Sequence, residues 1–466
     1  MPLRLAKFRV FGLFGQFDYD IPLRLEEHVT AIIAPNGIGK TLCLRMINAF
    51  FRQKWTVFNG INFDYVEFEF TNSQIIRLRW IDDGAAEAAA VKLNISIELI
   101  LNGSVTFNWR PKFSEQRKLA SIERSLPFLT RMGGDRWRSD YTGEVLSFSD
   151  IVELYADQLP NSTMDTLFGS CPDWLSTIVN NIDCRLIETQ RLLILRDRKG
   201  DQPAWASRGP SGQSTLAIDR KSQIIKTIIA SEISQYASVS QTLDRSFPRR
   251  VISNTFAGSE TDLEKRLAEL DKKRIQLMEA GILDPDTEAE MAFPEGPFEP
   301  AISRVLSVYA SDVDQKLSIL SPLLEKIKLF KMLIDKRFLT KDVRITKSDG
   351  LSVSFNDRNI PLQALSSGEQ HQLVLFFEML FEIRPNSLIL IDEPELSLHV
   401  SWQKNFIKDL MSIIELNKFD VILATHSPQL IGRWNRLVVE LGDVDIDDPE
   451  DTSASRPHAA FVQKEA

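Results

Sequence analysis

Apolar and polar residues alternate along much of the stretch 1–110. Four segments there are rich in β-branched and aromatic side chains and predict strands: 3–11, 66–70, 74–81 and 91–101. A shorter apolar run at 28–33 leads into a glycine-containing loop, and residues 40–51 then have the spacing of an amphipathic helix. The pattern predicts a β-rich layer that contains one strand–loop–helix unit.

Helical spacing replaces this alternation in the middle of the chain. Residues 200–215 are rich in Gly, Pro and Ser and predict a mobile loop. The apolar stripe after it has a helical period: Ile225, Ile229, Tyr236, Val239 and Leu243. A heptad seam follows within 260–279: Leu263, Leu267, Leu270 and Leu277. Because Arg274 breaks this seam and it is too short for a free coiled coil, it predicts only a short helical arm.

Strand and helix alternate after a proline-rich break at 284–300 and a long helical stretch at about 303–338. Two short strands are predicted at 343–346 and 351–355. A helix, a strand, a helix and a strand then follow in order: 368–382, 387–392, 400–416 and 420–425. This order is typical of parallel β-α-β units, so the predicted fold class is α/β. The acidic, polar residues after 443 are expected to be partly disordered.

The composition is that of a globular protein. Hydrophobic residues make up 43% and charged residues 26% of the chain, and its apolar runs are too short to span a bilayer. Cys43, Cys171 and Cys184 show no C-x-x-C spacing, so we expect neither a disulfide framework nor a zinc site, and a cytoplasmic location.

The distribution of charge leaves two interpretations open. A formal net charge of −9 disfavours a surface built for nucleic acid. Residues 326–344, however, carry seven Lys or Arg against two Asp. This basic stretch is either the solvated face of a helix or the lining of a nucleic-acid groove.

The loop "IIAPNGIGKTL" has the residues that binding a phosphate group requires. Gly37 and Gly39 let backbone N–H groups curl around phosphate oxygens. Lys40 would neutralise charge on the β- and γ-phosphates, and the hydroxyl of Thr41 would reach magnesium. Ala34 stands where the phosphate-loop pattern has its first glycine; a methyl group is tolerated there if φ stays negative.

Three further motifs follow in the last quarter of the chain. The apolar run "SLILIDEPE" ends in Asp392, placed to hold magnesium through water, and Glu393, placed to polarise the attacking water. Upstream, "ALSSGEQ" puts Ser366 and Gly368 at a helix N-terminus, which is an anion-binding position. Downstream, "ILATHSPQLI" puts His426 at the end of the next apolar strand, where its imidazole would contact a γ-phosphate.

In this order, with a large insertion after the loop, the motifs resemble those of the ABC-type ATPases, and the chain is similar to the soluble RecF, SMC, Rad50 and OLD-type proteins. The resemblance implies ATP and Mg2+ as cofactors, held by a phosphate loop that includes Asn36, a signature contact at Ser366 and Gly368, a Walker B pair and a switch histidine at His426. The segment "CRLIETQRLL" resembles the strand that delivers the family's Q-loop glutamine, which implies that Gln190 covers the magnesium ion.

The resemblance also implies an ABC-type ATPase head that is split by an insertion. Its expected parts are an N-terminal half with the phosphate loop, a helical insertion with the mobile loop and the short arm, a C-terminal half with the other motifs, and an acidic tail: 1–110, 111–340, 341–442 and 443–466. In this family the signature serine serves a nucleotide held by the opposite subunit. Each site is therefore completed across an interface, which implies a homodimer at least and a higher homo-oligomer.

Size, the opening "LRLAKFRVFGLFGQFDYDIPL" and the compact insertion resemble the ATPase subunits of two-gene bacterial anti-phage systems, the PARIS type first and the Septu type second. Only 40 residues follow His426, so we do not expect the TOPRIM nuclease domain that continues OLD-type chains. The resemblance implies a slow, regulatory ATPase that acts as sensor and scaffold. It would hold a separate TOPRIM-type nuclease until a phage protein triggers release.

A RecF-like DNA clamp in DNA repair is the alternative. In that interpretation five cations of the basic stretch line a DNA groove: Lys326, Lys328, Lys331, Lys336 and Arg337. A steep dependence of DNA affinity on salt would favour it.

Overall fold

A parallel sheet of five strands lies at the centre of the head, in the order β11-β15-β16-β3-β17. Its strands are β3 (Val29–Ile33), β11 (Cys184–Glu188), β15 (Leu388–Asp392), β16 (Asp420–Thr425) and β17 (Val438–Glu440). The three middle strands are buried along nearly their whole length, as expected of a sheet covered on both faces. Because all five run the same way, their carboxyl ends meet at one edge.

The computed structural model describes most of the chain. The described residues are 2–35, 37–81, 95–111, 122, 125–126, 128–133, 136–140, 143–155, 159, 163, 167–188, 217–253, 259–284, 299–338, 340–397 and 400–442. The predicted mobile loop at 200–215 and the acidic tail at 443–466 lie outside them. None of the described helices is long and apolar enough to cross a membrane.

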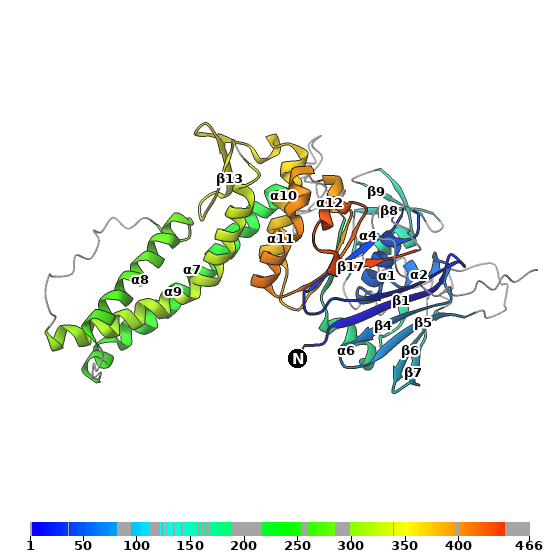
Figure 1. Ribbon diagram of the computed structural model, residues 1–466, viewed down its shortest axis with the longest axis horizontal. Coiled ribbons are helices and arrows are strands. Elements are labelled where there is room, and N and C mark those ends of the chain that lie inside the picture. The colour runs from blue at the N-terminus through cyan, green and yellow to red at the C-terminus, as the bar shows by residue number, and fades with distance from the viewer. Residues whose placement is uncertain are drawn as a thin grey trace, which may run out of the picture.

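An antiparallel sheet of six strands forms a second layer of the head, in the order β2-β1-β4-β5-β6-β7. Its strands are β1 (Leu5–Leu13), β2 (Phe17–Pro22), β4 (Tyr65–Phe70), β5 (Ile75–Trp80), β6 (Ile95–Leu101) and β7 (Ser104–Trp109). Helix α1 (Lys40–Phe51) lies between this layer and the parallel sheet, beside α2 (Trp55–Asn59) (Figure 1). The ring of Phe50 stacks on that of Phe68 with a centroid distance of 4.0 Å, which locks α1 against the antiparallel layer.

The opposite face of the parallel sheet is covered by α10 (Ser367–Phe377) and α11 (Val400–Asn417), which share one core with it (Figure 1). The C-terminal half of the head also contains four short helices: η2 (Leu362–Ala364), η4 (Pro394–Ser397), α12 (Pro428–Ile431) and η5 (Asn435–Leu437). This half and the antiparallel layer together enclose the parallel sheet. The expected mixed α/β head with a parallel sheet and flanking helices is confirmed.

Three long helices leave the head as an arm: α7 (Ala217–Ser253), α8 (Glu260–Glu279) and α9 (Pro300–Asp335) (Figure 1). With 37 residues, α7 spans about 55 Å. The four leucines of the heptad seam on α8 are buried and belong to the core that α9 shares. At the base of the arm lies a small sheet of β12 (Asp342–Thr346), β13 (Gly350–Phe355) and β14 (Arg358–Ile360).

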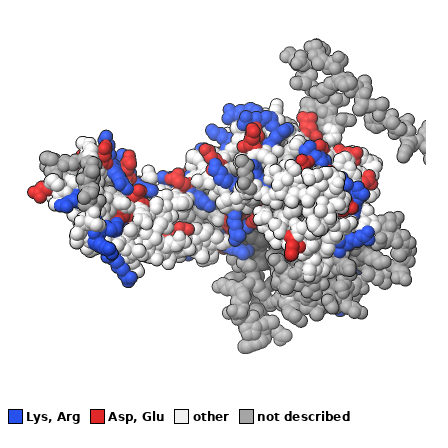
Figure 2. Space-filling model, turned by 90° about the horizontal axis from the view of Figure 1, so that it is seen from below, with Lys and Arg blue, Asp and Glu red and all other residues white. Residues whose placement is uncertain are grey.

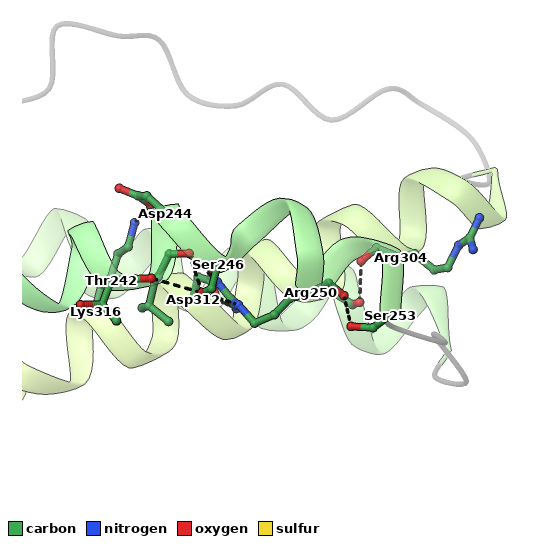
Figure 3. A network of polar contacts seen from close by, with 10 residues as sticks. Thr242, Asp244, Ser246, Arg250, Ser253, Arg304, Asp312 and Lys316 are labelled. Atoms are coloured by element: carbon green, nitrogen blue, oxygen red, sulfur yellow. Dashed lines mark hydrogen bonds and ion pairs between the residues drawn. The ribbon is translucent and has the colours of Figure 1, made fainter.

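A polar network holds α7 to α9 in the part of the arm far from the head. The Arg250 guanidinium forms two charge-assisted hydrogen bonds with the buried carboxylate of Asp312, and its Nη2 also donates to the carbonyl of Leu243 at 2.8 Å (Figure 3). Closer to the head, Lys316 Nζ donates to Asp244 Oδ1 at 2.8 Å. Both pairs join residues far apart in sequence, so they fix the register of two antiparallel helices.

Two predictions about secondary structure were wrong in part. The stretch 111–340 was expected to be a helical insertion, but a three-stranded sheet and two helices occupy its first part: β8 (Leu129–Gly133), β9 (Arg136–Ser139), β10 (Val145–Ser147), α4 (Phe148–Tyr155) and α6 (Asp173–Asn181). These elements pack with Trp137 and Phe148 into the core of the N-terminal half rather than onto the arm. Strand β11 also belongs to the head, because it pairs with β15.

The single helix predicted at 368–382 changes to a π-helix, η3 (Glu378–Glu382), after Phe377. Asn417 Nδ2 donates to the carbonyls of Met379 and Leu380 at 2.7 and 2.9 Å, which stabilises the wider turn. The buried ammonium of Lys221, at the root of α7, bridges Glu378 and Glu382. The arm is therefore tied directly to this segment.

Candidate nucleotide-binding site

The phosphate loop joins β3 to α1 and has the backbone that its glycines allow. Gly37 has a φ of 85° and Gly39 one of 98°, in the region that favours glycine. A Cβ at Gly39 would lie 3.1 Å from a methyl carbon of Leu13, whereas the space beside Gly37 is open. The helix that follows begins at Lys40, so its free N–H groups face the loop. Asn36 lies outside the described residues.

Lys40 folds back over this loop. Its Nζ donates to the carbonyls of Ala34 and Pro35 at 2.6 and 3.0 Å, and it lies 3.1 Å from Nδ1 of His426. Ala34 is buried at the strand end, where its methyl group fits. The ammonium therefore occupies the loop interior, within reach of any phosphate that the loop encloses.

Burial lowers the pKa of Lys40, and the nearby carboxylates Glu393, Asp392 and Glu395 raise it by less. The net shift is downward. An anionic ligand in the loop would reverse this balance, because an opposite charge stabilises the ammonium form.

Thr41 and Asp392 form a pair suited to magnesium. Thr41 Oγ1 donates to Asp392 Oδ1 at 3.2 Å, and Asp392 ends β15 at the edge where the parallel strands finish. Hydroxyl and carboxylate oxygens are the hard ligands that Mg2+ prefers, and Mg2+ at nucleotide sites takes its other ligands from phosphate and water. No group of three His, Cys, Asp or Glu side chains suited to a metal occurs among the described residues. This pair therefore fits a magnesium ion shared with a nucleotide.

Glu393 and His426 face each other across the ends of β15 and β16. His426 Nε2 lies 3.3 Å from Glu393 Oε1. Glu393 has a φ of 45°, and its N–H donates to the carbonyl of Ala424 at 2.9 Å. A non-glycine residue in this region is strained by about 1–3 kcal/mol, and such strain concentrates at functional positions.

These groups open onto one cavity of about 700 Å³, a size that suits a nucleotide. The phosphate loop, Glu393 and His426 line it on one side. On the other side are residues that the sequence did not single out: Phe14, Arg45, Thr56, Val57, Asn59, Gly60 and Ile61. A signal for Phe14 existed, since the turn "GLFG" displays this aromatic ring (45% exposed) between two glycines. The α2 residues carry no motif that could have found them.

The signature segment does not line this cavity. Ser366 is the N-cap of α10, where it forms a capping box with Glu369, and Gly368 lies in the first turn. Burial raises the pKa of Glu369, but hydrogen bonds from Lys341 and Ser366 outweigh it and lower the pKa overall. The serine is thus held at a rigid helix start, apart from the phosphate loop of its own chain.

Gln190 lies outside the described residues. The strand before it, β11, pairs with β15 so that Glu188 is opposite Asp392. Strand β11 therefore ends at the edge of the sheet where the magnesium pair lies.

Three solved structures align with nearly the whole chain at low identity: an Smc head domain with an extended coiled coil bound to the C-terminal domain of ScpA from Pyrococcus furiosus (13% identity, 94% of this chain and 93% of that chain, TM-score 0.32), the SMC head domain from Thermotoga maritima (14%, 92% and 91%, 0.34), and an SmcHead bound to the C-winged helix domain of ScpA (11%, 94% and 93%, 0.33). No curated protein matches the chain.

A family model described as AAA ATPase domain, AAA_15, matches residues 199–431, which is half of the chain. The match contains the signature, the Asp392–Glu393 pair and His426, and it begins after the phosphate loop. The chain therefore belongs to the AAA_15 family of AAA ATPase domains, and it is an ATPase.

Proposed function

We propose that the protein binds ATP with Mg2+ in the cavity at the ends of β3, β15 and β16 and hydrolyses it there. The observation that carries this proposal is the convergence of Lys40, Thr41, Glu393 and His426 on one cavity at three neighbouring strand ends, with Asp392 hydrogen-bonded to Thr41 beside it. Bound Mg2+ supplies charge neutralisation at the phosphate oxygens. Thr41 and Asp392 would hold it, and Lys40 would turn from the loop carbonyls to the phosphates.

In this proposal Glu393 orients and polarises the attacking water, and His426 contacts the γ-phosphate. The ring of His426 lies between Lys40 Nζ and Glu393 Oε1, at 3.1 and 3.3 Å. It is therefore placed to align the base with the phosphate charge, which is the positioning that phosphoryl transfer requires.

Each site is completed by a second copy of the chain. Ser366 and Gly368 do not line the cavity of their own chain, although they begin a helix whose N-terminus suits an anion. A twofold pairing that brings this helix start onto the partner's phosphate loop leaves two equivalent sites. The protein is then a homodimer at least, and ATP joins its heads.

At the level of the cell, we propose an ATP-dependent sensor and scaffold in a cytoplasmic anti-phage system, similar to AriA of PARIS, with the Septu ATPase PtuA as second choice. The partner would be a separately encoded TOPRIM-type nuclease like AriB, released by a phage protein. This proposal rests on the sequence resemblance. The arm adds a long surface, tied through Lys221 to the π-helix that continues α10, along which such a partner could be held.

Two of the five cations that the RecF-like alternative places in a DNA groove, Lys328 and Arg337, contact other residues of the chain. Arg337 is buried and paired with Asp409, and it lies against the ring of Phe376. Lys328 donates to Gln276 Oε1 on the neighbouring helix α8 at 2.9 Å. Lys and Arg side chains do gather along one edge of the head in Figure 2, with charges of both signs elsewhere on that face. Among the described residues, no specific contact favours DNA.

A pull-down tests the scaffold proposal. The tagged protein is expressed with the neighbouring reading frame of its own operon, and wild type is compared with Glu393→Gln in ATP and Mg2+. A stoichiometric second protein, retained more by Glu393→Gln, is expected. A homo-oligomer that instead retains DNA in a salt-sensitive manner would favour the repair clamp.

A further inference from the structure

Glu395 forms a link between the Walker B segment and the histidine loop. It lies in η4, two residues beyond Glu393, and its Oε1 accepts the backbone N–H of His426 at 2.6 Å. A hydrogen bond this short to a carboxylate is of the charge-assisted kind, which is about twice as strong as a neutral one. The Glu395 side chain therefore holds the backbone of His426, from which the imidazole extends.

A second set of hydrogen bonds, made by Gln403, connects the same two segments. Gln403 Nε2, on α11, donates to the carbonyl of Glu395 at 3.3 Å, and its Oε1 accepts from Ser427 Oγ at 2.9 Å. Ser427 N–H in turn donates to Thr425 Oγ1 at 3.0 Å. The loop after β16 is thus held to η4 at His426 and to α11 at Ser427.

The two carboxylate oxygens of Glu395 differ in their hydrogen bonding. Oε2 is buried and lacks a hydrogen-bond partner in the part of the chain that the structure describes. A buried acceptor without a donor costs about 1–3 kcal/mol. The side chain is therefore kept in place at a cost, and the contact that it makes there is the one to the His426 N–H.

We infer that Glu395 is a positioning residue of the ATPase site, which holds His426 between Lys40 and Glu393. This inference rests on the proposed hydrolysis at this site. Loss of the acceptor frees the His426 N–H and lets the loop turn. The imidazole then leaves its place 3.1 Å from Lys40 Nζ and 3.3 Å from Glu393 Oε1. Glu395 makes no hydrogen bond to the phosphate loop, and its charge acts on Lys40 less than those of Glu393 and Asp392 do, so nucleotide affinity is expected to change little.

The first test compares Glu395→Ala with Glu395→Gln, which keeps an acceptor oxygen. Glu395→Ala is expected to lower kcat about 10–100-fold, the rate equivalent of one hydrogen bond to a charged group. The affinity for a fluorescent ATP analogue should remain within about threefold of wild type, and Glu395→Gln should recover most of the turnover. Glu415→Ala, an exposed carboxylate on α11, is the matched control and should behave as wild type.

The second test is a double-mutant cycle with His426→Ala. If Glu395 acts through His426, adding Glu395→Ala to that variant lowers kcat by less than about twofold. Losses that multiply, or a drop in nucleotide affinity as large as the drop in kcat, would overturn the inference, as would a Glu395→Ala variant with full turnover. The proposed function fails separately, when the wild-type chain neither binds the analogue nor hydrolyses ATP.

Discussion

Lys40 is the side chain on which nucleotide affinity depends most. Its ammonium lies inside the phosphate loop, and no other cation occupies that position among the described residues. Lys40→Ala removes several charge-assisted contacts to the phosphates, so affinity for ATP should fall at least about 100-fold. Titration with a fluorescent ATP analogue measures this. The control is Lys404→Ala, an exposed lysine on α11. Undiminished affinity in Lys40→Ala would exclude the phosphate-loop assignment.

Substitution of Glu393 is expected to separate ATP binding from ATP hydrolysis. Glu393→Gln keeps the size of the side chain but removes the carboxylate that polarises water. The variant is expected to bind ATP as wild type does and to turn it over at least ~100-fold more slowly, the scale of losing a general base. Phosphate release in single-turnover experiments checks the rate, and the same titration checks affinity. Wild-type turnover in this variant would assign the base to another residue.

Residues that carry a sequence motif could be predicted, and residues that act through distant contacts could not. Asp392 and His426 stand at strand ends that hydrophobic patterning locates, and Lys40 begins the helix after the loop of a third such strand, so their proximity follows from parallel β-α-β order. Glu395 differs, because its significance depends on the N–H of His426, 31 positions away. Phe14 likewise needed the fold to bring a turn of the antiparallel layer to the phosphate loop.

At the scale of elements, strand and helix ends were predictable where the apolar period is regular. The strand at 420–425 and the helix at 260–279 have the predicted bounds. The π-helix at 378–382 was not predictable, because Asn417 and Lys221 stabilise it from other helices. Strands β8 to β10 were missed for a related reason: they are short and acquire their core only against α4.

The arm depends on its polar network. In Arg250→Met, the buried Asp312 carboxylate loses its partner, so pairing of α7 with α9 should weaken by about 2 kcal/mol. The double variant Arg250→Met/Asp312→Leu removes both charges. It should weaken the pairing of α7 with α9 by less than Arg250→Met alone does, because no carboxylate is then left unpaired. Hydrogen exchange of amides in the two helices, followed by mass spectrometry, measures both. Equal protection in wild type and Arg250→Met would show that the pair contributes nothing.

At the scale of the whole molecule, the open question is whether one chain holds a complete site. The cavity is lined by the phosphate loop, Glu393 and His426, but not by Ser366 or Gly368. Two variants separate these halves. Lys40→Ala removes the phosphate-binding half of the site and leaves the signature, whereas Ser366→Arg blocks the signature and leaves the phosphate loop.

Each variant alone is expected to be inactive, because both sites of its homodimer lack one half. A one-to-one mixture should regain turnover, because a mixed dimer pairs the Lys40 of one chain with the Ser366 of the other. With random exchange, half of the dimers are mixed and each has one intact site of two, so about a quarter of the wild-type sites return. Steady-state ATPase assays measure this, and native mass spectrometry confirms that mixed dimers form. If they form and turnover stays absent, the site is not shared between chains in this way. Ser366 would then serve its own chain as the cap of α10, and ATP would not be the element that joins two heads.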